Sequence, residues 1–284
     1  MIYLILAIVS SSLISIFMRL SENHIKNEMG MFMANYALCT ILAVGFMDKS
    51  GPILGDNGQH LTLTIGIITG ALFLGSFLFL KINMKYNGIV LAATFMKLGV
   101  LIPTLMAIIV FGEIPTVMQI MGISLAIIAI IIIHFDNDNL QDGAEAKANK
   151  KIWLLVLLIL GGLGDSMSNV FEKIGPASGK DGFLIMTFFT ALAITIAIVV
   201  AGKKKIHKED ILFGILVGIP NYFSARFLLA ALGAIEAVIV YPTYSVATMV
   251  VIAIAGVVAF GEKISMKKGI ALGLIAVAIA LLNM

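Results

Sequence analysis

Four polar residues near the middle of the chain share one face of an otherwise apolar segment. Asp165, Ser168, Asn169 and Glu172 stand at positions i, i+3, i+4 and i+7 of a run that begins at Ile152. Residues at these spacings lie on the same face of a helix. A carboxylate on such a face can give up or take up a proton when a polar solute binds. The stripe therefore indicates a site where a proton and a solute compete.

Two cations also fall inside apolar segments, Lys97 and Arg226. A charge near the centre of a bilayer costs about 2.5–3.5 kcal/mol on insertion scales, so such residues usually face a cavity and serve a function. Lys97 and Arg226 could hold a carboxylate or a phosphate. The alternative is an ion pair between Lys97 and Asp165 that only holds two helices together.

Polar side chains mark faces of several further segments. Tyr241, Tyr244, Ser245 and Thr248 repeat the i, i+3, i+4, i+7 spacing, and tyrosine rings can hold a cation by the ring face. Many of the serines and threonines could instead bond their own helix carbonyls. The residues expected to bind substrate or protons are Asp165, Lys97, Arg226, Ser11, Ser15, Ser168, Asn169, Asn221, Tyr222, Tyr241, Tyr244 and Ser245. Their mixed charge favours a small zwitterionic or amphipathic metabolite.

The elements that carry these residues are membrane helices by composition. The chain has 284 residues, of which 60% are hydrophobic and 12% charged, with a mean hydropathy of +1.08. Apolar runs of about 20 residues are long enough to cross a bilayer. In lipid, only a helix satisfies its own backbone at this length. The sequence predicts an all-α integral membrane protein with ten spans, at about 2–19, 29–47, 61–80, 88–111, 116–134, 152–173, 182–201, 211–233, 236–260 and 268–283.

The polar segment 135–151 divides the chain into two halves of five spans, 1–134 and 152–284, that resemble each other. Gly66 and Gly70 of "GIITG" recur as Gly214 and Gly218 of "GILVG", and "FGE" occurs before the last span of each half. Because five is odd, the second half must cross the membrane in the opposite sense to the first. Two inverted five-helix repeats around a central cavity are typical of secondary transporters.

The basic residues predict the orientation. Of the 17 lysines and arginines outside the spans, 14 fall on one side of the expected topology. Cytoplasmic loops carry the excess of basic residues. We therefore expect a multi-pass protein of the cytoplasmic membrane, inner or plasma, with both termini extracellular.

The first span, "IYLILAIVSSSLISIFMRLSE", resembles the opening helix of the small multidrug resistance proteins. The "FGE" motifs and the paired halves resemble the drug/metabolite transporter superfamily and its ten-span EamA-type members. The resemblance implies a helical bundle around a central cavity that works by alternating access. Family members with ten spans often have cytoplasmic termini, whereas the charges of this chain indicate the opposite.

One departure from the family concerns the acidic residue of the first span. The small multidrug resistance proteins carry a glutamate where this chain has Ser11. Matching Met18 and Arg19 to Glu172 and Lys173 puts Asp165 on the equivalent position of the second half. The resemblance therefore implies that Asp165 is the acidic residue that couples transport.

These observations favour a secondary active transporter of a small organic metabolite or drug-like solute, most simply a proton-coupled exporter. A passive facilitator or exchanger without proton coupling is the alternative, and a membrane scaffold would not require charges inside its spans. No nucleophile–base set, metal-ligand cluster or P-loop is present, so we expect no enzyme activity, cofactor, metal or ATP drive. The expected partners are a small-molecule substrate, the lipid bilayer and protons, but no nucleic acid. A monomer suffices for the pathway, and a dimer stays open.

Overall fold

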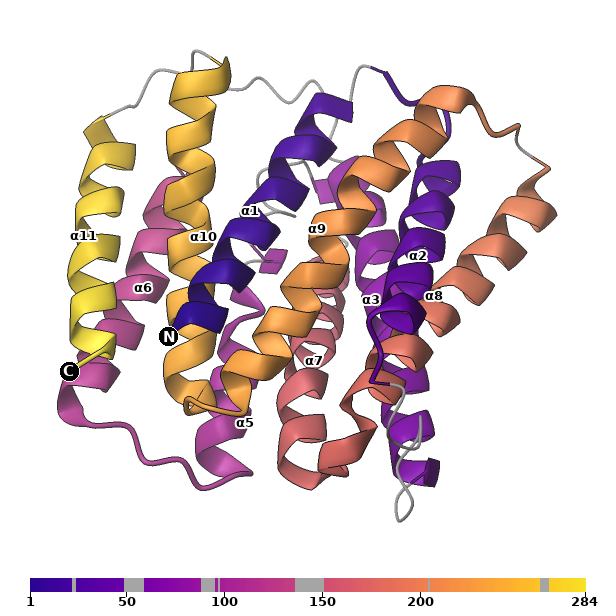
Figure 1. The fold of residues 1–284 in the computed structure, drawn as a ribbon. Coiled ribbons are helices and arrows are strands. Elements are labelled where there is room, and N and C mark those ends of the chain that lie inside the picture. Colours follow the sequence, from indigo (N-terminus) through magenta and orange to yellow (C-terminus); the bar gives the residue numbers. More distant parts are fainter. Residues whose placement is uncertain are drawn as a thin grey trace. The chain divides into compact units, whose positions relative to one another are not determined.

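The computed structural model describes residues 1–21, 24–48, 59–87, 95–96, 98–135, 151–203, 205–260 and 266–284 (Figure 1). These residues form helices and no strand, which confirms the all-α prediction. The short 3-10 helix η1 covers Ala177–Gly179. The α-helices are α1 (Ile2–Ser21), α2 (Glu28–Gly45), α3 (Gln59–Asn87), α5 (Leu101–Ile109), α6 (Val117–Phe135), α7 (Lys151–Ile174), α8 (Lys180–Gly202), α9 (Lys208–Leu232), α10 (Ala237–Phe260) and α11 (Met266–Leu282).

Seven helices among the described residues are long and apolar enough to cross a membrane: α1, α2, α3, α7, α8, α9 and α10. The chain is therefore a multi-pass membrane protein by the length and composition of its helices. The apolar helices in α6 and α11 are shorter. The ten-span arrangement stays a prediction.

The fourth expected span, 88–111, is not one continuous helix where the structure describes it. Gly99 and Val100 form a turn before α5. Pro103 has no N–H to offer the carbonyl of Gly99, and that carbonyl instead accepts a hydrogen bond from the Ile102 N–H at 3.0 Å. Non-helical backbone at membrane depth is found where it is buried in protein or lines a cavity.

The chain forms two compact units. Unit 1 contains residues Met1–Leu74 and Met167–Gly233, and unit 2 contains Gly75–Ser166 and Ala234–Met284. Two of the three boundaries fall inside α3 and α7, and the third lies between α9 and α10. Each unit thus combines segments from both halves of the sequence, and the division into repeats at 1–134 and 152–284 stays a prediction.

Glycines set the close helix packing of unit 1. α9 packs against α1 and α2, and α2 packs against α8. A Cβ atom on Gly214 would lie 2.5 Å from both the Ala34 Cβ and the Met31 carbonyl oxygen, and one on Gly66 would lie 2.6 Å from the Met186 Cβ. Small residues at these positions allow the backbones to approach. The glycine pairs of "GIITG" and "GILVG" therefore serve close helix packing.

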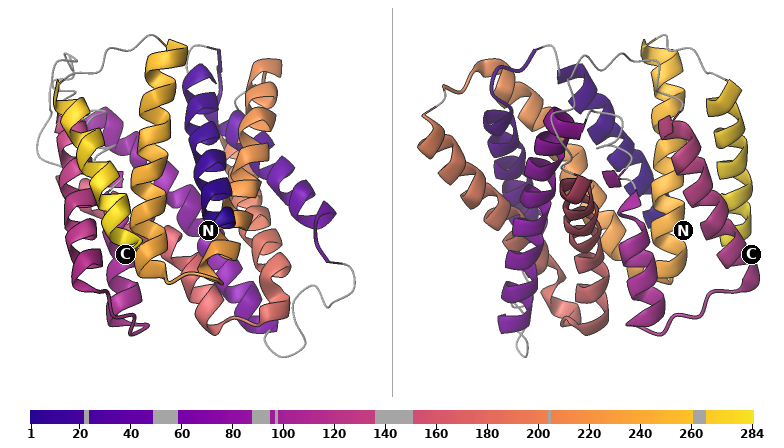
Figure 2. Two further views of the ribbon diagram at one scale, coloured as in Figure 1. Left: turned by 60° about the vertical axis from the view of Figure 1, so that its left-hand side comes forward. Right: turned by 180° about the vertical axis from the view of Figure 1, so that it is seen from behind.

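In unit 2, α6 packs against α11, and α10 packs against α5, α6 and α11. α6 and α11 lie side by side and run in opposite directions in each view (Figures 1 and 2). Gly122 makes their contact close, because a Cβ atom there would lie 2.9 Å from the Leu282 Cγ and 3.0 Å from the Ala278 carbonyl oxygen.

The first "FGE" motif has a structural explanation within unit 2. Gly112 has φ +68°, a conformation that L residues with a side chain rarely adopt. The turn places the Glu113 carboxylate at the start of α10, where Oε2 accepts a hydrogen bond from the Val238 N–H at 2.8 Å. An acidic group there satisfies a free donor and complements the helix dipole. The matching Gly261 and Glu262 lie outside the described residues.

A buried carboxylate in unit 1 connects the start of α9 to the segment between α1 and α2. Asp210 is fully buried. Its Oδ1 accepts hydrogen bonds from the Lys26 N–H at 2.8 Å and the Asn27 N–H at 3.0 Å, and its Oδ2 accepts one from the His207 N–H at 2.8 Å. Asp210 therefore closes the capping box of α9 and fixes the connection between α1 and α2.

We expect Asp210→Ala to lower the free energy of unfolding by about 3 kcal/mol or more, because three backbone donors lose a charged acceptor. Glu209→Ala, at the exposed neighbouring position, should change it by less than about 0.5 kcal/mol. Thermal unfolding of the purified variants in detergent measures both. An equal effect of the two substitutions would contradict the proposed fastening.

Candidate functional site

The polar stripe of α7 is divided between the two units. Asp165 lies in unit 2 and its side chain is exposed. Ser168 and Asn169 lie in unit 1 and are buried, at 6% and 2% exposure. Glu172, near the end of α7, is held by Lys180 of α8, whose Nζ is 2.7 Å from each carboxylate oxygen. The stripe thus combines an accessible acid, two buried polar groups and an ion pair.

In unit 2, α10 and the start of α5 surround the segment of α7 that leads to Asp165. The Tyr241 hydroxyl donates a hydrogen bond to the Asp165 carbonyl oxygen at 2.7 Å. Gly162, one turn earlier, meets the Gly99 turn so closely that a Cβ atom would lie 2.7 Å from the Ile102 Cβ. The interrupted fourth segment therefore packs on α7 within one turn of Asp165.

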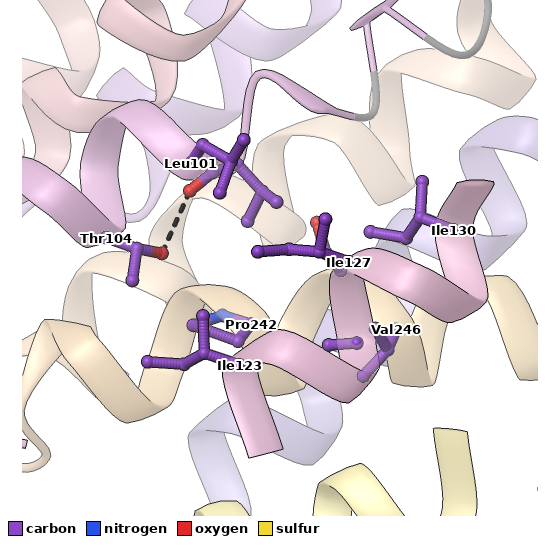
Figure 3. Close-up of a pocket in the computed structure, with 10 residues that line it drawn as sticks. Leu101, Thr104, Ile123, Ile127, Ile130, Pro242 and Val246 are labelled. Carbon is purple, nitrogen blue, oxygen red and sulfur yellow. Dashed lines mark hydrogen bonds between the residues drawn. The ribbon is translucent and has the colours of Figure 1, made fainter. Parts of the chain in front are cut away.

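A small pocket of unit 2 lies beside this segment, between α5, α6 and α10 (Figure 3). Its walls are mainly aliphatic and include Leu101, Ile127 and Val246. Two hydroxyl residues line it, Thr104 and Ser245, and the Thr104 hydroxyl donates to the Val100 carbonyl oxygen at 2.9 Å. Among the expected site residues, Ser245 is the one that lines this pocket.

In unit 1, a polar cluster joins α2 and α9 inside apolar helices. The Asn221 Nδ2 donates to the Asn35 Oδ1 at 3.1 Å. The Cys39 thiol lies 3.3 Å from the Gly218 carbonyl oxygen and is fully buried. The hydrogen bond between the two amides holds α2 and α9 together. Asn221 is half-buried, so part of its side chain remains exposed.

Arg226, one of the residues expected to bind substrate, lies in an ion pair, and its role in binding stays a prediction. Its guanidinium donates to the Asp181 Oδ1 at 3.0 Å and to the Tyr222 hydroxyl at 2.7 Å, and lies 5.9 Å from the centre of the Tyr222 ring. Asp181 also accepts a hydrogen bond from the Asp48 N–H at 2.9 Å. Arg226 therefore connects α9 to the start of α8, and Asp181 connects the start of α8 to the residues after α2.

The remaining expected residues have varied surroundings. Ser11 and Ser15 are half-buried on α1, and Tyr244 is half-buried on α10. Lys97 lies outside the described residues, so its expected pairing with Asp165 stays a prediction. The described residues contain no group of three or more His, Cys, Asp or Glu side chains that could hold a metal ion.

Sequence reasoning missed several polar groups that matter in unit 1. Asp181 and Lys180 were assigned to the break before a span, yet they pair with Arg226 and Glu172. The Tyr36 and Thr187 hydroxyls are buried and have no hydrogen-bond partner among the described residues. Only the packing of the helices distinguishes a satisfied hydroxyl from an unsatisfied one.

Comparison with known proteins identifies a shared fold. No family model matches the chain, and no curated protein matches it. A solved crystal structure, described only as that of a protein, covers 99% of this chain and 94% of its own, with a TM-score of 0.74 and 13% sequence identity. At this identity the similarity shows a shared fold alone.

Proposed function

We propose that the protein is a secondary active transporter that moves a small organic solute across the membrane by alternating access. The observation that carries the proposal is an exchange of helix contacts between the two sequence halves. Gly214 of the second half packs on α2 of the first, and Gly66 of the first packs on α8 of the second. Inverted repeats of this kind are the usual frame of secondary transporters.

The atoms that these glycines meet correspond one to one. Gly214 faces the Met31 carbonyl, the Ala34 Cβ and the Asn35 N–H, whereas Gly66 faces the Phe183 carbonyl, the Met186 Cβ and the Thr187 N–H. In each of the three pairs, the residue that Gly66 meets lies 152 positions after the residue that Gly214 meets. The three positions lie on one helix face at i, i+3 and i+4, so together they give one correspondence, in which the same face of α2 and of α8 receives the corresponding glycine of the other half.

Two further observations support the inverted repeat. α6 and α11, the last helices of the two halves, run in opposite directions (Figure 2). The buried Ser12 donates to the Ile8 carbonyl oxygen at 2.8 Å, and Ser166 donates to the Gly162 carbonyl oxygen at 2.6 Å. The same offset of 154 that relates Ser12 to Ser166 relates Ser11 to Asp165.

The acidic residue of the proposed transporter is Asp165, in the second half only. Its side chain is exposed among the described residues, and the Tyr241 hydroxyl donates a hydrogen bond to its backbone carbonyl oxygen. A single carboxylate that binds either a proton or a solute gives antiport. The chain's resemblance to drug/metabolite transporters supports this assignment.

A screen for solutes that raise the unfolding temperature of the purified protein tests the proposal. A ligand that binds the folded state stabilises it by an amount that grows with the logarithm of its concentration relative to its Kd. We expect stabilising solutes whose effect is lost or becomes independent of pH in Asp165→Asn. If every stabilising solute acted equally on both proteins at all pH values, Asp165 would have no part in binding or coupling, and the passive facilitator would be favoured.

The proposed orientation has both chain termini outside the cytoplasm. In unit 1, the Asp210 end of the helices carries the basic residues Arg19, Lys26, Lys203, Lys205 and Lys208, and the opposite end carries Lys173 and Lys180. The positive-inside rule assigns the richer end to the cytoplasm. A C-terminal reporter that is active only outside the cytoplasm should be active, and activity of a cytoplasm-only reporter would contradict this orientation.

A further inference from the structure

Asn169 carries a buried amide group that the described part of the chain does not satisfy. The residue is 2% exposed, and neither its Nδ2 nor its Oδ1 has a hydrogen-bond partner among the described residues. A side-chain amide offers two donors and one acceptor. Native proteins rarely leave buried polar groups without hydrogen bonds, and no described residue supplies those of Asn169.

The charges of unit 1, by contrast, are already balanced. Five charged side chains described in this unit are not fully exposed: Glu172, Lys180, Asp181, Asp210 and Arg226. Glu172 pairs with Lys180, Arg226 pairs with Asp181, and Asp210 accepts three backbone hydrogen bonds. No charge among these five is therefore left for a solute of opposite charge.

Among the described residues of unit 1, the buried side-chain groups that lack any polar or charged partner are neutral. Besides the amide of Asn169 they are the Tyr36 hydroxyl and the Thr187 hydroxyl, both in buried side chains. Two ionisable atoms also lack a hydrogen bond by geometry, but Glu172 Oε2 lies 2.7 Å from Lys180 and His207 Nδ1 lies 3.4 Å from Asp210. These buried groups therefore lack hydrogen-bond partners, but they do not lack a counter-charge.

We infer that Asn169 binds the transported solute through hydrogen bonds, and that the solute is a polar molecule without net charge that carries both donors and acceptors. The inference rests on the proposed transport function and gives its substrate class. A lipophilic cation that has no N–H or O–H group and no acceptor atom cannot hydrogen-bond with the amide. The face of Tyr222 is also not open to such a cation, because the Arg226 guanidinium already lies over it.

The test compares solutes of two classes on the full-length protein and on Asn169→Leu. The polar class is represented by D-ribose, xylitol, L-glutamine and L-serine, and the cationic class by tetraphenylphosphonium and methyltriphenylphosphonium, which have no N–H or O–H group. Leucine has a similar size and removes only the unsatisfied polar atoms, so the variant should unfold at the same or a higher temperature without solute. Thr195→Val is the matched control, because its buried hydroxyl already donates to the Ala191 carbonyl oxygen at 2.6 Å.

We expect a polar solute to raise the unfolding temperature of the wild type and of Thr195→Val, with at least a tenfold weaker apparent affinity for Asn169→Leu. Asn169→Ala, which also removes the amide, should repeat the loss. If a polar solute stabilised Asn169→Leu and the wild type equally, the amide would hold only a water molecule and the inference would be wrong. Stabilisation by the cations alone would also overturn it and leave the transporter proposal intact, whereas failure of both classes would count against both.

Discussion

Replacing Gly70 or Gly214 by alanine should lower the free energy of unfolding by about 3 kcal/mol for each substitution, because a single methyl group overpacks a close helix contact. At Gly70 the new Cβ would collide with the Thr187 carbonyl oxygen, and at Gly214 it would lie 2.5 Å from the Met31 carbonyl oxygen. Backbone oxygens cannot move aside as a flexible side chain can. Thermal unfolding in detergent and the yield of folded protein measure the effect.

The matched controls are Gly75 of the same helix as Gly70 and Gly161 of α7. A Cβ atom at either position would meet nothing within 4 Å. Alanine there should be neutral or stabilise by about 0.5–1 kcal/mol, because glycine loses more backbone freedom in a helix. Equal destabilisation at all four glycines would mean that the exchanged contacts between the sequence halves do not hold unit 1 together.

We expect Asp165→Asn to reduce proton-driven solute accumulation at least tenfold in proteoliposomes, which is about 1.4 kcal/mol or more of lost coupling. Asparagine keeps the shape of the side chain but cannot carry the proton. Since Asp165 is exposed and the Tyr241 hydrogen bond goes to its backbone, the variant should remain folded. Equilibration of the solute down its own gradient can continue.

Glu236→Gln is the control for this substitution, because it removes an exposed carboxylate just before α10. Its accumulation of solute should match the wild type. If Asp165→Asn accumulated solute as well as the wild type with the same dependence on pH, another group would carry the proton, and Lys97 would be the next residue to replace.

The helices themselves could be predicted from the sequence, because hydropathy over about 20 residues is a local property. The expected segments at 2–19, 152–173 and 182–201 correspond to α1, α7 and α8. The interruption of the fourth segment was not predicted. Two residues cause it together: Pro103, which lacks an N–H, and Gly99, which packs closely on Gly162. The contact with Gly162 could not be predicted, because that residue is far away in the chain.

The partners of the polar residues could not be predicted, because they lie far apart in the sequence. Arg226 was assigned to substrate binding on the evidence of its position inside a span, whereas Asp181, 45 residues earlier, neutralises it. Asp210 was placed in a polar connection, and its burial follows only from the packing of the segment at Lys26 and Asn27 against it. Asn169 was expected to contribute to the site, and its unsatisfied amide is visible only once the neighbouring helices are in place.

The most direct test of the transporter proposal is the accumulation of a stabilising solute in proteoliposomes under an imposed pH gradient. A proton antiporter concentrates the solute on the acidic side above its concentration on the other side, and a protonophore abolishes the difference. A facilitator brings the two concentrations to equality with or without the gradient. We predict gradient-dependent accumulation by the wild type, and simple equilibration by the wild type would contradict the central claim.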